Sequence, residues 1–176
     1  MSIFKFLIVF FLVHSFFLPA QSSQENALNG LFNQLKKVNN SKTAKLLEKK
    51  IWSIWNKHPN DVKLTEKLEF GTELMDYGSY DYALKVFDNI LNTDPGWSEA
   101  WNKRATLFFL LNRHAESLSD IERVLDIESR HFGALSGQAR IFIKLQEYEK
   151  AILSIKRALV FYPSFKSGAL IPEIER

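Results

Sequence analysis

A repeat of 34 residues runs through the C-terminal part of the chain and constrains its fold more than any other feature. Three columns of small or apolar residues keep this spacing: Gly71, Ala105 and Ala139; Phe87, Ile121 and Ile155; and Ile90, Val124 and Ala158. Because independent columns agree on one period, the pattern predicts a repeat architecture in which each unit buries its apolar face against its neighbours.

Each unit carries two apolar faces with helical spacing. In the middle unit, the first face consists of Trp101, Ala105, Phe108 and Leu111, and the second of Leu118, Ile121, Val124 and Leu125. Spacings of three and four residues are typical of an amphipathic helix. Gly78 stands where a first helix ends, which is typical of a left-handed C-cap. We therefore predict antiparallel helix pairs in the units 64–97, 98–131 and 132–165.

Residues at fixed places in these units resemble the tetratricopeptide repeat (TPR) family. Beside the Gly or Ala at the eighth place, the family pattern has Ala at the twentieth place, an aromatic residue at the twenty-fourth and Pro near the end. The matching residues here are Ala83 and Ala151, Phe87, and Pro95 and Pro163. The resemblance implies an all-α fold, a right-handed α-solenoid of antiparallel helix pairs with about three full repeats. The whole chain is also similar to small exported bacterial proteins that carry such repeats.

Four residues depart from the family pattern: Arg104, Ser117, Ser129 and Gln138. Arg104 is the most informative, because the family usually has a buried leucine at this place. Asp120, on the following helix of the same unit, is within reach of it. We predict that the two side chains form an ion pair that specifies helix packing.

The flanks of the repeats are predicted to complete the solenoid. Residues 24–60 hold two further apolar helical faces, separated by a break at 39–41, but they do not follow the 34-residue register. Since solenoids need end caps, we interpret this hairpin as a degenerate or capping repeat. Residues 166–176 are interpreted as a short C-terminal capping segment.

Residues 1–22 have the composition of a secretory signal peptide. A basic residue near the start precedes the apolar run Phe6–Leu18, and small and polar residues follow. Cleavage is expected after Ala20 or Ser22, which would release the protein into the periplasm. The alternative is that Met1–Leu18 stays as an uncleaved anchor, so that the protein is a membrane-tethered envelope assembly factor.

Charge separates the hairpin from the repeats. From Gln24 to Asn60 seven lysines face two glutamates, a net charge of +5, whereas the residues from Asp61 onward carry a net charge of −3. The formal charge of the whole chain is only +3, which is too small to predict a nucleic-acid partner. We interpret the lysines as a solvated face, with contact to a membrane surface as the alternative.

The sequence offers no recognisable catalytic or cofactor motif. It has no cysteine, its four histidines lack metal-ligand spacing, and no glycine-rich phosphate-binding motif is present. His131 opens a predicted helix and is interpreted as a surface residue or a helix cap. We therefore predict no enzyme, no metal and no cofactor. The remote alternative, a hydrolase of an envelope polymer, would need Asp76 and Glu99 to form an acid pair across the groove.

A stack of helix pairs forms a concave surface that is lined by the first helix of each pair. The inner places of the TPR pattern fall on Thr72, Met75, Asp76, Asn102, Thr106, Phe109, Ser136, Arg140 and Ile143. This mixture of apolar, amide and hydroxyl groups suits an extended peptide or a partner helix. Gly133 and Gly137 stand where some family members carry basic residues that grip a C-terminal carboxylate, so that clamp is not expected. The sequence thus predicts a non-catalytic interaction module or scaffold with a protein or peptide partner.

Overall fold

The computed structural model describes residues 18–174, and these residues form helices and turns without strands. The long helices are α1 (Leu18–Leu35), α2 (Ser41–Trp55), α3 (Val62–Asp76), α4 (Tyr80–Thr93), α5 (Ser98–Leu110), α6 (His114–Ile127), α7 (Phe132–Lys144) and α8 (Tyr148–Phe161). A short 3₁₀ helix, η1 (Lys166–Leu170), and α9 (Ile171–Ile174) follow. The predicted all-α fold is confirmed.

The predictions for residues 1–17 lie outside the described part of the chain. Helix α1 begins at Leu18, so the two predicted cleavage sites fall within its first turns. None of the helices between residues 18 and 174 combines the length and the hydropathy needed to cross a membrane.

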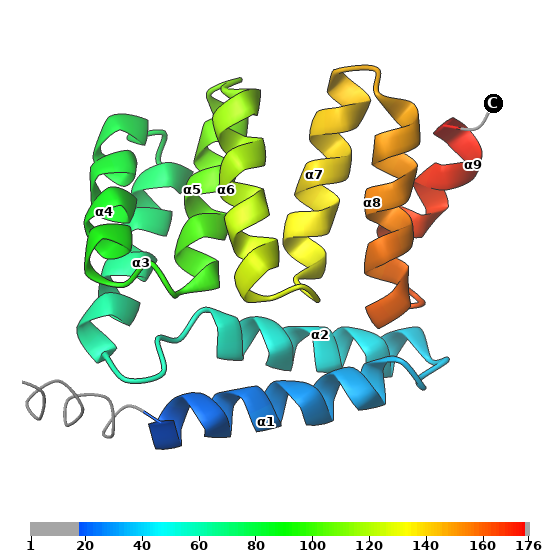
Figure 1. The fold of residues 1–176 in the computed structure, drawn as a ribbon, viewed down its shortest axis with the longest axis horizontal. Helices are drawn as coiled ribbons and strands as arrows, with labels where there is room; N and C mark the ends of the chain where they lie inside the picture. Colours follow the sequence, from blue (N-terminus) through cyan, green and yellow to red (C-terminus); the bar gives the residue numbers. More distant parts are fainter. Residues whose placement is uncertain (1–17, 175–176) are drawn as a thin grey trace, which may run out of the picture.

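Helices α3 to α8 form three antiparallel pairs that stand side by side (Figure 1). The first helix of each pair is followed by a residue with positive φ: Gly78 (75°), Asn112 (57°) and Gln146 (60°). In each case the next backbone N–H donates to a carbonyl oxygen five positions earlier. These bonds run from Ser79 to Leu74, from Arg113 to Phe108 and from Glu147 to Phe142, each 2.8 Å long. The left-handed cap predicted at Gly78 is therefore confirmed, and its geometry recurs in every repeat.

The hairpin of α1 and α2 lies across the ends of the repeats and does not continue their stack (Figure 1). Its apolar residues, Phe32 and Trp55 among them, share one core with Phe132 at the start of α7 and Tyr162 at the end of α8. The Tyr162 hydroxyl also donates to the Glu48 carboxylate of α2 at 3.1 Å. The sequence predicts a helical hairpin in this region, and one is present. Its partner, however, is the third repeat, because the third repeat supplies the aromatic side chains that cover it.

Polar contacts also hold the hairpin at the end opposite its turn, where α2 ends beside the first half of α1. The Gln24 side-chain amide donates to the carbonyl oxygens of Ile54 and Lys57, each at 3.0 Å. Arg130, in the loop before α7, donates to the Glu25 carboxylate of α1 at 3.2 Å and to Glu128 at 2.7 Å. The hydrogen bond to Glu128 is the main reason that the pKa of Arg130 is raised above its usual value. Helix α1 is thus tied both to α2 and to the loop between the second and third repeats.

Candidate binding groove

A pocket of about 290 Å³ lies between the inner helices α5 and α7 and the hairpin helix α2. We call it the groove pocket. Its lining includes Asn102, Thr106 and Phe109 from α5, Gly133, Ser136, Gly137 and Arg140 from α7, Glu48 and Trp52 from α2, and Phe165 from the segment after α8. Apolar rings and polar side chains therefore face one cavity from four parts of the chain.

Five of the nine residues predicted for the groove line this pocket: Asn102, Thr106, Phe109, Ser136 and Arg140. They lie on the second and third repeats, which the hairpin crosses. Asn102 is 9% exposed, so its amide belongs to the floor of the pocket rather than to its open surface. Arg140 is exposed, and no described residue forms an ion pair with it.

The structure does not bring the other four predicted residues into the groove pocket. Met75 is only 8% exposed and packs in the core of the first repeat. The Thr72 hydroxyl donates to the carbonyl oxygen of its own helix at Leu68, 2.8 Å away. Asp76 is exposed at the C-terminal end of α3, and Ile143 is half-buried farther along α7. The pocket therefore spans two repeats, not three.

Gly133 allows the indole of Trp52 to close one side of the pocket. A Cβ atom at Gly133 would lie 2.5 Å from Cη2 and 2.8 Å from Cζ2 of Trp52, well inside ordinary contact distance. The indole is held in place by edge-on contacts with the rings of Trp55, His131 and Phe132, whose centroids are 5.4 to 5.5 Å away. Gly133, which stands where some family members carry a basic residue that grips a carboxylate, is thus the place where Trp52 of the hairpin docks.

Sequence reasoning missed three further pocket residues, Glu48, Trp52 and Phe165. Glu48 and Trp52 lie outside the 34-residue pattern, and Phe165 is the last residue of the third unit, beyond the end of its second helix. The available signal was Gly133, since a glycine near the start of a helix indicates a close approach by another group.

A buried polar network supports the floor of the pocket. The side chains of Glu99 and His131 are both fully buried, and His131 Nε2 lies 3.0 Å from Glu99 Oε2. His131 Nδ1 accepts the backbone N–H of Ala134 at 3.0 Å, so Nε2 carries the proton and donates to Glu99. The Asn102 amide also donates to Glu99, and the His131 ring stacks on Trp55 with centroids 4.0 Å apart. Of the two roles predicted for His131, the cap is confirmed and the surface position is wrong, because the ring is fully buried. The cap joins the floor of the groove to the hairpin.

Arg104 links the first and second repeats. Its guanidinium donates twice to Asp120, at 2.8 and 2.9 Å, and once to Asp88 of the preceding repeat at 2.6 Å. The hydrogen bond to Asp120 is the main reason that the pKa of Arg104 is raised above its usual value, and Asp88 adds to it. The predicted ion pair with Asp120 is confirmed, and it extends across the boundary between two repeats.

No protein-family model matches the chain. The chain is 33% identical over 149 residues to a TPR repeat-containing protein of Rhizobium etli, and the match covers 85% of this chain and 72% of that protein. The chain belongs to the TPR repeat family. A DnaJ homolog subfamily C member 7 homolog of Schizosaccharomyces pombe is 30% identical over 101 residues, which are 55% of this chain and 21% of that protein.

Solved TPR structures share the fold of this TPR protein. One is the first TPR of Spaghetti (RPAP3) bound to the HSP90 peptide SRMEEVD, with a TM-score of 0.60 and 24% identity, covering 64% of this chain and 90% of that one. Another is a TPR protein from Parabacteroides merdae, with a TM-score of 0.59 and 20% identity, covering 87% of this chain and 59% of that one. At these identities the likeness concerns the fold alone.

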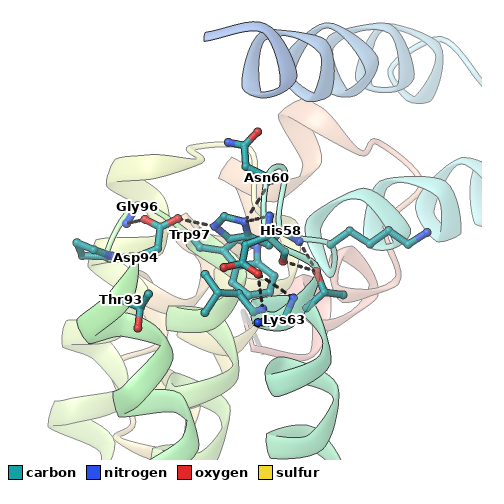
Figure 2. A network of polar contacts seen from close by, with 12 residues as sticks. His58, Asn60, Lys63, Thr93, Asp94, Gly96 and Trp97 are labelled. Carbon is teal, nitrogen blue, oxygen red and sulfur yellow. Dashed lines mark hydrogen bonds and ion pairs between the residues drawn. The ribbon is translucent and has the colours of Figure 1, made fainter. Parts of the chain in front are cut away.

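The TPR protein has a second pocket, of about 680 Å³, where the loops before α3 and α5 meet Gln24, Glu25 and Leu28 of α1. His58 holds these loops together (Figure 2). Its Nε2 lies 2.7 Å from Asp94 Oδ2, while its Nδ1 accepts the backbone N–H groups of Asp61 and Asn60 at 2.9 and 3.2 Å. Because Nδ1 is an acceptor, Nε2 is the ring nitrogen that donates to Asp94. These bonds join the loop before the first repeat to the loop that follows its second helix.

The structure separates the two carboxylates that the hydrolase alternative required. Helices α3 and α5 run in the same direction, because each is antiparallel to α4. Asp76 lies at the last residue of α3 and Glu99 in the first turn of α5, so they stand at opposite ends of the groove. Glu99 is moreover fully buried against His131. Within residues 18–174, no group of three or more potential ligands is arranged to hold a metal ion.

Proposed function

We propose that this TPR protein is a non-catalytic interaction module that binds an extended segment of a partner protein in the groove pocket. The observation that carries the proposal is the pocket itself, where the exposed Arg140 and the half-buried Ser136 of α7 share the lining with the apolar rings of Phe109, Trp52 and Phe165. Two solved TPR structures of similar fold support a peptide ligand. One is the first TPR of Spaghetti bound to an HSP90 peptide, and the other is a complex of the TPR2B domain of yeast Sti1 with pHsp70.

The charges of the pocket favour a segment that combines a carboxylate with an apolar side chain. Arg140 and Lys144 lie one turn apart on α7 and are exposed. Lys144 Nζ lies 4.9 Å from the ring centroid of Phe109. The acid in the lining, Glu48, already accepts a hydrogen bond from Tyr162. A partner carboxylate would thus meet the exposed guanidinium of Arg140, which forms no ion pair with a described residue.

Photocrosslinking in the producing cell tests this proposal. A benzophenone amino acid in place of Phe109 would face the groove pocket, whereas the same group in place of the exposed Tyr148 would face solvent outside it. We expect one discrete crosslinked partner from position 109 and none of that mass from position 148. The Arg140→Glu substitution should abolish the crosslink, and the matched Arg157→Glu substitution on α8 should leave it intact. Equal crosslinks from all these forms would refute the groove as the binding site.

The proposal also places the module outside the cytoplasm. It rests on the apolar run and the small residues of the first 22 positions. Cleavage after Ala20 or Ser22 would leave the contacts of the hairpin from Gln24 onward in the mature chain. The intact mass of the accumulated protein tests this part. A mature chain that begins at Gln21 or Ser23 would support it, and a mass that includes Met1 would refute it.

A second candidate is a module tethered at the membrane surface. The observation in its favour is that the seven hairpin lysines are all exposed and form no ion pair with any described residue. Such a face is attracted to anionic lipid. Flotation with vesicles of phosphatidylglycerol tests it, with vesicles of phosphatidylcholine as the control. Equal recovery with both kinds of vesicle would exclude the electrostatic tether.

A further inference from the structure

Each repeat has a pair of side chains at the same two places, one on its first helix and one on its second. In the second repeat the pair is Arg104 and Asp120, which bond to each other and to Asp88 of the repeat before. In the third repeat it is Gln138 and Ser154, joined by a hydrogen bond of 2.9 Å. In the first repeat the 34-residue register places Phe70 and Val86 there. The pair therefore lies on the side of a repeat that meets the repeat before it.

The first repeat has no repeat before it among the described residues, and this side of it is open. The hairpin that would precede it packs on the third repeat instead. Phe70 is consequently 54% exposed, and Tyr77, two turns farther along α3, is 86% exposed. Exposed aromatic side chains in the described chain are Phe70, Tyr77, Tyr82 and Tyr148. Three of these four lie on or beside the first repeat, and we call Phe70 and Tyr77 with their flanking charges the open end.

The charges beside Phe70 are sorted by sign. With about 100° per residue in an α-helix, Lys67 and Glu73 lie about 60° to either side of Phe70. Glu66 falls on the same side as Glu73, and Lys63 falls toward the side of Lys67. All four side chains are exposed. Lys67 donates to the neutral Asn89 at 2.8 Å, and none of the four forms an ion pair with a described residue. The open end thus has a basic flank and an acidic flank along one aromatic stripe.

We infer that the open end binds a second copy of this chain, with the two α3 helices parallel about a two-fold axis. In that arrangement the basic flank of each copy faces the acidic flank of the other, and Phe70 and Tyr77 meet their own counterparts. An antiparallel pair would instead place like charges together along both seams. The sorted charges therefore select a second copy in one orientation. The groove pocket lies on the second and third repeats and stays open in the dimer.

The oligomeric state of the purified chain, in the form that the cell accumulates, tests the inference. Sedimentation velocity should show a monomer–dimer equilibrium. Phe70→Glu should raise the dissociation constant at least about tenfold, because a charge replaces the apolar centre of a small interface. Leu153→Glu is the matched control, since Leu153 is 61% exposed on α8, and it should leave the equilibrium unchanged. A wild-type chain that stays monomeric at a concentration of about 0.1 mM would have a dissociation constant above that concentration. This result would overturn the inference.

Two charge-reversal variants test the orientation. One variant carries Lys63→Glu and Lys67→Glu, so both of its flanks are acidic, and the other carries Glu66→Lys and Glu73→Lys, so both are basic. Each variant alone should be monomeric, because like charges meet along both seams. An equimolar mixture should form a heterodimer, which native mass spectrometry resolves by mass. Circular dichroism of each variant checks that it is folded. Folded variants that dimerise alone, or that fail to pair when mixed, would overturn the parallel arrangement.

Discussion

The Gly133→Ala substitution tests whether the hairpin is docked on the third repeat as the structure shows. The new methyl carbon would lie 2.5 Å from one atom of the Trp52 indole and 2.8 Å from a second. An exposed indole would swing away at little cost. This one is enclosed by the rings of Trp55, His131 and Phe132, so the hairpin itself must shift to admit the methyl group.

The magnitude follows from two opposed effects. Overpacking of a closely packed site costs typically about 1–3 kcal/mol. Replacing glycine by alanine in a helix gains up to about 1 kcal/mol, and the gain is smaller here because Gly133 lies in the first turn of α7. We therefore expect Gly133→Ala to lower the free energy of unfolding by about 1–2 kcal/mol, or Tm by about 2–8 °C.

Gly137, one turn farther along α7, provides a matched control. A Cβ atom there would meet only Ile121 Cδ1, at 3.7 Å, which is an ordinary contact. Gly137→Ala should therefore raise the free energy of unfolding by about 0.5–1 kcal/mol. Urea unfolding followed by circular dichroism measures both variants. In a Trp52→Ala background the clash is gone, so Gly133→Ala should lose its cost, with a coupling energy of at least about 1 kcal/mol. Equal stabilisation by both alanines in the wild-type background would refute the docking of Trp52 on Gly133.

Two further predictions concern the ionisable contacts. Arg104→Ala leaves Asp120, whose side chain is 6% exposed, without its cation and should cost about 2–4 kcal/mol; the double variant Arg104→Phe with Asp120→Val, which copies the apolar pair of the first repeat, should recover most of that loss in urea unfolding. Burial, with the Glu48 carboxylate second, raises the pKa of Tyr162 to about 12, so a spectrophotometric titration should show one tyrosine that ionises well above the usual value of about 10. Because the folded-state pKa is the higher one, this stabilisation is fully present below pH about 10 and is lost as the pH rises toward about 12. Glu48→Gln should lower that pKa, and an unchanged titration would contradict the contact.

The repeats could be predicted from the sequence because their contacts are local and periodic. Residues that share a column, such as Gly71 and Ala105, occupy equivalent places in successive helix pairs, so spacing alone specifies which faces pack. The same register singled out Arg104, because it stands at a place of the second repeat where the family usually has a buried leucine. A buried charge at a place that usually holds leucine needs a counter-charge nearby, and Asp120 was in reach.

The position of the hairpin could not be predicted in the same way. The hydrophobic faces of residues 24–60 indicate that two helices bury something, but amphipathic spacing does not say against which partner. The partner proved to be an aromatic cluster around Phe132 and Tyr162, about 80 to 130 residues away in sequence. The repeats therefore predicted the α5 and α7 sides of the groove pocket but not the side that α2 forms. Thr72, Met75 and Asp76 were assigned to a part of the groove that the hairpin does not reach.

One packing preference explains both the closed pocket and the open end. The short linker from Asn56 to Asp61 keeps the end of α2 near the start of α3. The hairpin can therefore differ only in the direction in which it extends, toward the first repeat or toward the third. Against the first repeat it would cover the exposed rings of Phe70 and Tyr77 beside charged flanks. Against the third repeat it covers a larger apolar set, Phe132, Leu135, Ala158 and Tyr162, and burial of each aromatic side chain removes about 150–250 Å² from water. The hairpin packs on the third repeat because it buries more apolar area there than it would on the first repeat. This packing places Trp52 at the groove pocket and leaves Phe70 without a neighbour.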